Sequence, residues 1–390
     1  MERRKLVVIV VMALVMFVAC TPKEKSIVRD TPVIQRLEVD FSKESRKKIE
    51  SYFNRQFKQG KFNGNVLVAV KDSVFQHAYG YANIQAKVPL TDSSKFQLAS
   101  VSKMLTAYGT LLLVQEGKLA LSDTVGKFLP DFPYYGVTIE QLLSHRSGLS
   151  NYMYVTDSAW ADKEFSMCNN EAYDVFVEQN PMYYYPPDKR FDYCNTNYFL
   201  LAYIIERVTN LPFESYMAQE VFDPLEMHNT LVYTNMNYEQ LPNIAVGTNG
   251  YGHPKPDFYL NGVCGDKGVY STVADMKKFH DALVWGKVLN DSLTQLMYAP
   301  YSPFSSRGNS YGFGFRLRKY GNKTLIYHNG WWRGYHTYFL HFPEEDACII
   351  VFSNTIKGGY LKQTELLRLL PFHFLDDGKK GSGVSSPQNS

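Results

Sequence analysis

Ser100 and Lys103 lie three residues apart in the segment QLASVSKMLTAYG at 97–109, where an apolar helical stretch begins. Residues three apart at a helix start share one face, so the Lys103 amine can approach the Ser100 hydroxyl. The positive end of the helix dipole and burial both disfavour a charged amine, which would favour a base for a serine nucleophile. A serine can also simply cap a helix, and S-x-x-K is common by chance. The pair alone leaves both interpretations open.

Two further triplets could complete a serine-based site. Tyr193 and Asn195 are two apart before a helical stretch, and His328 and Gly330 follow a strand-like run. A serine nucleophile needs a proton acceptor, donors for the oxyanion and groups that orient the substrate. Tyrosine can exchange protons with a lysine, asparagine offers donor and acceptor, and an edge-strand glycine allows close backbone approach. Each also has an ordinary alternative: a buried tyrosine, a turn asparagine or a solvent histidine.

Together, S-x-x-K, Y-x-N and H-x-G in this order resemble the signature of the penicillin-recognising serine hydrolases. The chain is most similar to the branch with class C β-lactamases, serine D-alanyl-D-alanine carboxypeptidases, D-aminopeptidases and related esterases. The resemblance covers roughly residues 44–370. Four further segments are typical of the family: LALSDTV at 119–125, VTIEQLLSHRSGL at 137–149, VFDPLEM at 221–227 and GVYSTVAD at 268–275.

This resemblance implies a role for each catalytic residue. Ser100 would be the nucleophile, and Lys103 and Tyr193 would share its proton as general base and later acid. Asn195 would contact the acyl side of the substrate, and His328 would lie near Tyr193 and the anionic or leaving-group end. No metal and no organic cofactor is implied.

The oxyanion hole implied by the resemblance consists of two backbone N–H groups. They belong to Ser100 and to Trp331, which directly follows Gly330. The next residues are bulky, and Arg333 could bind a substrate carboxylate or be a plain surface charge. Both interpretations of Arg333 stay open.

Two departures from the family pattern bear on substrate. His328 replaces the lysine of the K-T-G typical of class C β-lactamases, and H-x-G instead occurs in peptidases and esterases of the branch. A strong β-lactamase is therefore not expected. Cys194 replaces the usual serine in Y-x-N, and we expect its thiol to point away from Tyr193 and Asn195.

Other hydrolase chemistries fit the sequence less well. The G-x-S-x-G elbow of α/β-hydrolases is matched at 308–312, but that elbow needs a strand before it and a helix after it. Here a loop-like stretch precedes and a strand-like stretch follows. The nine histidines contain no H-E-x-x-H; His336 and His341 would face opposite sides of a strand, and His145 is interpreted as a structural hydrogen bonder. A zinc hydrolase is not expected.

The surrounding elements place these residues between a sheet and a helical insert. A helix is expected at 45–59, closed by Gly60, and strands at 65–71, 74–81, 311–318, 323–328, 335–342 and 347–352. Helices are expected at 104–115, 138–143, 197–208 and 361–370. This pattern predicts an α+β fold with an antiparallel sheet flanked by N- and C-terminal helices. The sheet lobe would comprise about 44–98 and 260–375, and the inserted, mainly helical lobe about 99–259.

The N-terminus predicts export. A charged start is followed by an uncharged apolar run, residues 6–19, that is short for a membrane span, and then by Cys20. Residues 17–20, FVAC, resemble a lipobox, so we expect a lipoprotein-type signal peptide at 1–20 with Cys20 lipidated; an ordinary signal peptide or an uncleaved anchor are the alternatives. Residues 21–43 would be a tether, 44–375 the hydrolase domain and 376–390 a disordered tail.

Composition limits the partners. With a formal net charge of +3, the chain lacks the basic footprint of a nucleic-acid-binding protein. Four cysteines remain besides Cys20, and we favour mostly buried free thiols over disulfides. We expect a monomer, held at a bacterial membrane by its lipid and facing outside the cytoplasm.

The sequence therefore predicts a serine hydrolase that acts through an acyl-enzyme on a small ester or amide, such as a D-amino-acid peptide or an acyl ester. The substrate could be derived from peptidoglycan. A β-lactamase with weak or specialised activity, or a non-catalytic penicillin-binding-type sensor, are the alternatives.

Overall fold

Seven antiparallel strands form the central sheet of the computed structural model, which describes residues 41–234 and 241–375. The strand order is β2-β1-β12-β11-β10-β9-β8, so β1, near the start of the domain, pairs with β12, near its end. The strands are β1 (Gly64–Val70), β2 (Ser73–Tyr79), β8 (Asn309–Tyr311), β9 (Arg316–Tyr320), β10 (Lys323–Trp332), β11 (Tyr335–Phe342) and β12 (Ala347–Ser353). The expected antiparallel sheet built from both ends of the chain is confirmed.

Both faces of this sheet are covered, because alternate residues of β1 enter different cores. Leu67 and Ala69 belong to the core between the sheet and the helical lobe, which we call the inner layer. Val66, Val68 and Val70 belong to a second core on the opposite face, the outer layer. Alternation is the expected behaviour of strand side chains, and coverage of both faces explains why β1 is buried along its whole length.

Helix α1 (Lys43–Lys58) packs one apolar face into the outer layer. Its N-cap Ser42 accepts a hydrogen bond from the backbone N–H of Ser45, and Ile49, Tyr52 and Phe53 form its buried stripe. The C-terminal helix α10 (Gln363–Leu367) adds Leu366 and Leu367 to the same core. It is shorter than the expected 361–370, since the 3₁₀ turn η5 (Ile356–Tyr360) precedes it.

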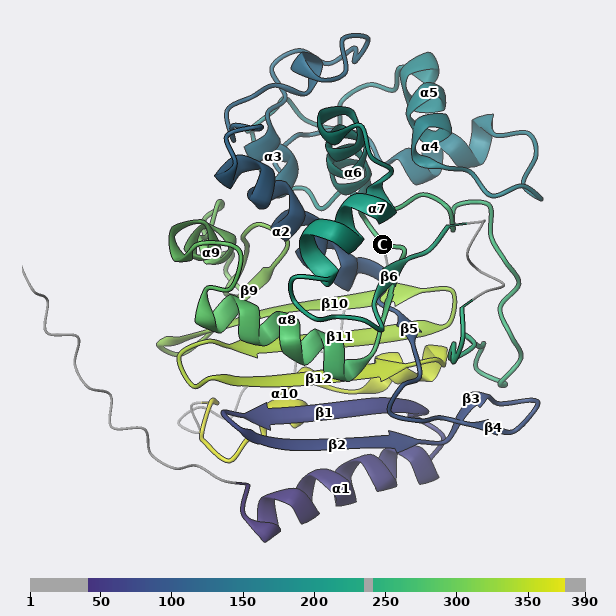
Figure 1. The fold of residues 1–390 in the computed structure, drawn as a ribbon, viewed down its shortest axis with the longest axis vertical. Coiled ribbons are helices and arrows are strands. Elements are labelled where there is room, and N and C mark those ends of the chain that lie inside the picture. The colour runs from purple at the N-terminus through teal and green to yellow at the C-terminus, as the bar shows by residue number, and fades with distance from the viewer. Residues whose placement is uncertain (1–40, 235–240, 376–390) are drawn as a thin grey trace, which may run out of the picture. The chain divides into compact units, whose positions relative to one another are not determined.

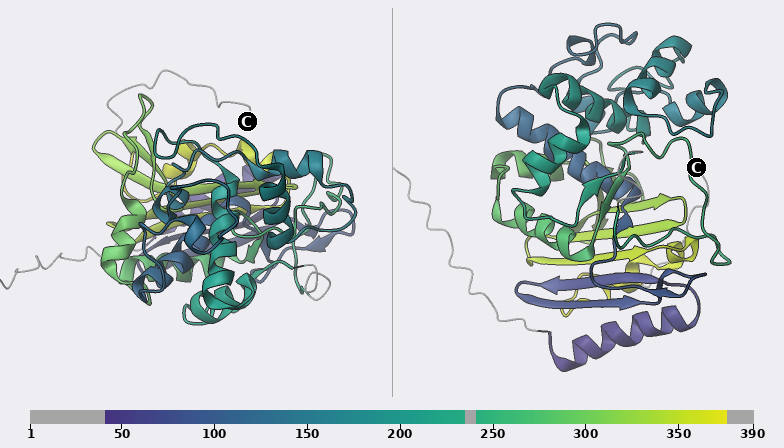
Figure 2. Two further views of the ribbon diagram at one scale, coloured as in Figure 1. Left: turned by 90° about the horizontal axis from the view of Figure 1, so that it is seen from above. Right: turned by 45° about the vertical axis from the view of Figure 1, so that its right-hand side comes forward.

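The helical lobe covers the inner face above the sheet in Figure 1, and the turned views of Figure 2 show the same separation. Its helices are α2 (Ser102–Gln115), α3 (Ile139–Leu143), α4 (Tyr152–Ala159), α5 (Asn169–Gln179), α6 (Asn195–Thr209) and α7 (Phe213–Met217), with the π-helical turn η3 (Ala218–Phe222) and the 3₁₀ turn η2 (Val125–Lys127). Helix α8 (Val273–Trp285) packs on β1 and β12, and α9 (Asp291–Tyr298) packs near α2.

Short strands at the junction of sheet and lobe were not expected from the sequence. Strands β5 (Phe96–Gln97), β7 (Val269–Ser271) and β6 (Leu231–Val232) form a three-stranded sheet, and β3 (Tyr81–Asn83) pairs with β4 (Val88–Pro89). Strands of two or three residues are too short to produce a detectable period-2 pattern. The 3₁₀ turn η1 (Ala99–Val101) follows β5 directly and leads into α2.

The predicted signal peptide with Cys20, the predicted tether up to residue 40 and the predicted tail at 376–390 lie outside the described residues. All described residues belong to one unit, residues 39–390. Within the described ranges, the helices are too short or too polar to cross a membrane. The four described cysteines are free thiols; Cys194, Cys264 and Cys348 are buried and Cys168 is exposed.

Candidate active site

Ser100 and Lys103 meet at the junction of η1 and α2. The Nζ atom of Lys103 lies 3.2 Å from Oγ of Ser100, and the lysine side chain is fully buried. Nζ also donates to Oδ1 of Asn195 at 2.8 Å and to the carbonyl of Asp266 at 2.7 Å. Asn195 and the Asp266 carbonyl can take two N–H donors of Lys103, and a neutral amine held in this way can accept the Ser100 proton, as a base for a serine nucleophile must.

The backbone just before the nucleophile has an unusual conformation. Ala99 has φ of 51°, in the left-handed region that residues other than glycine rarely adopt. Ala99 is also buried, so the surrounding structure holds it there. This conformation turns the chain sharply between β5 and α2 and leaves Ser100 on the wall of the cavity described below.

Tyr193 faces Lys103 from the segment that precedes α6. Its ring centroid lies 5.1 Å from Nζ of Lys103, and its buried hydroxyl has no hydrogen-bond partner among the described residues. Buried polar groups in proteins are normally paired, and an unpaired one is a functional candidate. An open hydroxyl beside a base and a nucleophile is suited to proton exchange with a substrate.

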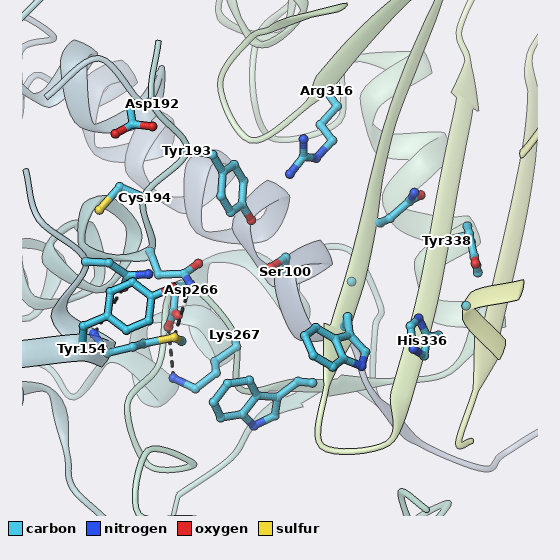
Figure 3. Close-up of a pocket in the computed structure, with 18 of the residues that line it drawn as sticks. Ser100, Tyr154, Asp192, Tyr193, Cys194, Asp266, Lys267, Arg316, His336 and Tyr338 are labelled. Atoms are coloured by element: carbon cyan, nitrogen blue, oxygen red, sulfur yellow. Dashed lines mark hydrogen bonds and ion pairs between the residues drawn. The ribbon is translucent and has the colours of Figure 1, made fainter. Parts of the chain in front are cut away.

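Asn195 begins α6 and links the lobe to the catalytic lysine. Its Oδ1 accepts from Lys103, and its Nδ2 donates to Sδ of Met153 at 3.4 Å. Between it and Tyr193, Cys194 is directed away from Tyr193 in Figure 3. Burial raises the pKa of the Cys194 thiol to about 11, which opposes a reactive thiolate.

His328 lies behind Tyr193 and not on the cavity wall, which differs from the expectation of direct substrate contact. Its side chain is fully buried, and its ring is 6.1 Å from that of Tyr193. Nδ1 donates to the carbonyl of Asn329 at 2.7 Å, so Nε2 accepts from the hydroxyl of Tyr311 at 3.2 Å. Burial lowers the pKa of His328 well below its usual range, so the ring is neutral at pH 7.

Gly330 lets β10 approach the nucleophile. A Cβ atom there would lie 2.2 Å from the Leu98 carbonyl oxygen and 2.3 Å from Oγ1 of Thr337, so no other residue fits. Trp331 follows on the same wall, with its side chain 68% exposed at the rim. Strand β9 pairs with β10 only as far as Tyr327, so within the described chain residues 328–332 have no strand partner on that side. The backbone of Trp331 is thus next to the cavity, as an oxyanion donor requires.

These residues line a cavity of about 560 Å³ between the lobe and β10. Figure 3 shows Ser100 at its centre, with Tyr193 and Arg316 on one side and Tyr154, Asp266 and Lys267 on the other. Two of the residues predicted for catalysis or substrate contact, Lys103 and His328, do not line the cavity. Lys103 is buried directly behind Ser100.

Three residues of the site escaped the sequence interpretation. Arg316 lines the cavity with its guanidinium 4.5 Å from the Tyr193 ring. Asp266 and Lys267 form a buried pair, 3.3 Å apart, on the opposite side. The segment GVYSTVAD begins one residue after Lys267, and Arg316 directly follows YGFGF at 311–315. A charged residue that adjoins a family segment or lies within a predicted strand was the signal that could have identified them.

The alternative chemistries have no support in the structure. Ser310 lies within strand β8 and not on a turn between a strand and a helix, so 308–312 lacks the geometry of a nucleophile elbow. Arg333 donates to the carbonyl of Pro256 and is not on the cavity wall. In the described part of the chain, the side chains spaced for a metal ion are His280, Asp281 and Asp346, and none of them lines the cavity.

His145 has the structural role that the sequence suggested. Its Nδ1 accepts hydrogen bonds from the backbone N–H of Cys194 at 3.1 Å and from Nδ2 of Asn197 at 3.0 Å. Burial lowers the pKa of His145 well below its usual range. A neutral His145 thus holds the Y-x-N segment in place.

Comparison with known proteins agrees with this geometry. The profile of the beta-lactamase family matches residues 49–370. Penicillin-binding protein 4* of Bacillus subtilis is 32% identical over 324 residues, which are 79% of this chain and 72% of that protein. Two crystal structures are similar. A penicillin-binding protein from Bacillus halodurans has a TM-score of 0.68 at 25% identity, and the match covers 78% of this chain and 94% of that chain.

A D-amino acid amidase from Ochrobactrum anthropi, complexed with L-phenylalanine amide, has a TM-score of 0.68 at 26% identity and covers 80% of this chain and 91% of its own. The family match spans residues 49–370, and the serine, lysine and tyrosine of the site lie together within it. The chain belongs to the beta-lactamase family of serine hydrolases.

Proposed function

We propose that this protein is a serine hydrolase of the cell envelope that cleaves a small amide or ester whose leaving group carries a carboxylate, such as a peptide ending in a D-amino acid. The observation that carries this proposal is Arg316. It is the cation on the cavity wall beside Tyr193, and within the described ranges it makes no ion pair with a carboxylate. An arginine in such a position can bind a substrate carboxylate in a bidentate manner.

The reaction would proceed in two steps. Ser100 Oγ attacks the acyl carbon while its proton passes to Lys103 or Tyr193, and the N–H groups of Ser100 and Trp331 stabilise the oxyanion. The C–N or C–O bond then breaks, and the proton goes to the leaving amine or alcohol. Water hydrolyses the acyl-enzyme by the same route in reverse, with Lys103 or Tyr193 taking a proton from the water.

The charged groups on the opposite side of Ser100 support the same orientation of the substrate, with its carboxylate towards Arg316. Asp266 is the carboxylate on that side, and Lys267 and Tyr152 already occupy its oxygens. It is therefore not available for the ammonium group that an aminopeptidase substrate would place on its acyl side. Asp192 also lines the cavity, but in Figure 3 Tyr193 stands between it and Ser100.

Apolar side chains line part of the acyl side. Met153, Tyr154 and Trp332 line the cavity next to Asn195. Such a surface fits an acyl group with an aliphatic or aromatic side chain better than a charged one.

The envelope location rests on the N-terminal sequence and on the relatives. Penicillin-binding proteins are among the proteins that this chain is similar to. Lipidation of Cys20 would hold the domain at the membrane surface. Fractionation of cells that express Cys20→Ser tests this: the variant should leave the membrane fraction, and its retention there would contradict a lipid anchor.

The substrate proposal is tested with matched pairs. We expect a higher kcat/KM for an acyl-D-alanyl-D-alanine peptide than for the same peptide with a C-terminal amide. Arg316→Met should remove this preference by lowering kcat/KM for the acid about 10²-fold, while leaving a nitrophenyl acyl ester within threefold. Arg318→Met is the control, because Arg318 lies on the same strand and does not line the cavity. Equal rates for acid and amide in the native protein would contradict the proposal.

The other candidate functions give different results in the same assay. Faster turnover of a chromogenic cephalosporin than of the peptide would indicate a β-lactamase. A fluorophosphonate probe that labels the native protein and fails to label Ser100→Ala identifies an active enzyme, whereas no labelling would indicate a sensor.

A further inference from the structure

Asp266 contacts two lysines in different ways. Its backbone carbonyl accepts a hydrogen bond from Lys103 at 2.7 Å. Its carboxylate is 1% exposed and accepts from Nζ of Lys267 and from the hydroxyl of Tyr152, both at 3.3 Å. The residue that holds the catalytic lysine by its main chain therefore carries a buried negative charge on its side chain.

Lys267 has no proton left for a substrate, although it lies on the cavity wall (Figure 3). Its Nζ donates to the Tyr152 hydroxyl at 2.7 Å, to the Val263 carbonyl at 2.9 Å and to Asp266. Burial lowers the pKa of Lys267, and the Asp266 carboxylate opposes that shift. With all three donors used inside the protein, Lys267 serves the residues around it.

Contacts other than those of Lys267 also hold the loop at 263–268. Oγ1 of Thr106 donates to the Gly265 carbonyl at 2.8 Å, and the Cys264 N–H donates to Oδ1 of Asn169 at 2.9 Å. Gly265 has φ of 98° and packs directly on α6, where a Cβ would lie 2.3 Å from the Tyr198 carbonyl oxygen. To these contacts Lys267 adds its hydrogen bond to the Val263 carbonyl and its positive charge.

Several groups surround Lys103, and Asp266 contacts it through its backbone carbonyl. The rings of Tyr193 and Tyr198 lie 5.1 and 5.8 Å from Nζ. His145 and His328 also face it, and both are neutral at pH 7 because burial lowers the pKa of each. The cations Lys267 and Arg316 complete the surroundings. The balance of charge near Lys103 therefore depends on whether Asp266 is neutralised.

We propose that Lys267 is a positioning residue that keeps Lys103 able to act as a base, by neutralising the buried carboxylate of Asp266. Without Lys267, the carboxylate of Asp266, whose backbone carbonyl contacts Lys103, would be left unneutralised near Lys103 and would stabilise its ammonium form, which cannot accept the proton of Ser100. The proposal rests on the roles of Ser100 and Lys103 given under the proposed function.

The test is the pH dependence of Ser100 acylation by a fluorophosphonate probe between pH 5 and 10, which needs no knowledge of the natural substrate. Lys267→Met should move the acidic limb of the rate profile up by about one pH unit, so that the rate at pH 7 falls about tenfold and recovers by pH 9. Asp266→Asn should move the limb in the opposite direction. The double variant Asp266→Asn/Lys267→Met removes both charges, so its acidic limb should lie within about 0.5 pH unit of the native position.

The double variant separates charge from structure. If the single substitutions act by damaging the loop, their effects should add in the double variant. If they act by unbalancing charge, their opposite pH shifts should cancel. Lys277→Met is the control, because Lys277 pairs with Asp281 on α8 and is not on the cavity wall. If Lys267→Met does not fold, the other two variants still test the proposal: Asp266→Asn should shift the acidic limb to lower pH, and the double variant should not. Unshifted limbs in all variants that label at Ser100 would overturn the inference, whereas labelling that persists in Ser100→Ala would overturn the proposed function instead.

Discussion

The two faces of the central sheet differ in what they bury. The outer layer, beneath α1 and α10, consists of aliphatic and aromatic side chains. The inner layer also encloses ionisable groups, among them Lys103, Lys267, His145 and His328. Burying charge is costly unless it is paired, whereas apolar burial stabilises directly. The comparison indicates that the outer layer mainly stabilises the fold, whereas the inner layer holds the catalytic groups at some cost in stability.

The largest effect that would test this division is expected in the outer layer. Phe53 is fully buried, with ring centroids of Tyr52, Phe62 and Tyr79 at 5.1, 5.2 and 5.9 Å. Phe53→Ala should lower the free energy of unfolding by about 3–5 kcal/mol, because it leaves a cavity. Urea unfolding measures this change. Below the melting temperature kcat/KM should stay within twofold.

Tyr135→Ala is the control for Phe53→Ala, because Tyr135 is 93% exposed. Its free energy of unfolding should change by no more than about 0.5 kcal/mol. A large loss of kcat/KM in folded Phe53→Ala would show that the two layers are not separable.

The next effect concerns the inner layer, where Tyr193→Phe removes a buried hydroxyl without a partner. Acylation should slow about 10²-fold with the loss of positioned acid–base catalysis. The free energy of unfolding should stay the same or rise, because no hydrogen bond within the described residues is lost. Stopped-flow acylation and urea unfolding measure the two quantities.

Tyr198→Phe should show the reverse pattern. Its hydroxyl donates to the Leu143 carbonyl at 2.7 Å in a buried position, so stability should fall by about 1–2 kcal/mol and acylation should change only a few-fold. Near-native acylation in Tyr193→Phe would contradict the assigned role of Tyr193.

The smallest effect is the pH dependence contributed by single histidines. Burial lowers the pKa of His145, His328 and His341 on the inner face, and that of His336 to about 4. An unfolded histidine titrates near 6.5, so below this pH the unfolded chain binds protons that the folded protein excludes. The free energy of unfolding should be flat above pH 7 and fall as the pH decreases from about 6.5 towards 4.

Each histidine should add at most about 1.4 kcal/mol per pH unit to this slope. His336→Gln should therefore reduce the slope between pH 6.5 and 4 by one such contribution, as measured by urea unfolding at several pH values. An unchanged slope would show that His336 takes up its proton in the folded state.

The sequence identified the parts of the site that lie within short motifs. Ser100 and Lys103 share one helical turn, and Tyr193 and Asn195 stand two apart in Y-x-N. The long strands and the helix α1 were predicted because their apolar residues repeat with a clear period. Local patterns of this kind are readable because the residues that produce them are close in the chain.

Contacts between distant segments were not readable in this way. Lys103 and Asp266 are 163 residues apart, and nothing in their spacing indicates that they touch. Arg316 reaches Tyr193 only because β9 begins beside the cavity. His328 is buried behind Tyr193, and both of its ring nitrogens are hydrogen-bonded there. Nε2 pairs with the Tyr311 hydroxyl and Nδ1 with the Asn329 carbonyl.

The half of β10 that β9 leaves unpaired has a consequence for inhibition. Residues 328–332 present backbone donors and acceptors beside Ser100, as an edge strand does. An extended peptide could add there as a further strand, so that main-chain hydrogen bonds supply affinity and side chains supply selectivity. A peptidomimetic with an N-methylated backbone would lose that affinity even if every side chain still fitted its subsite.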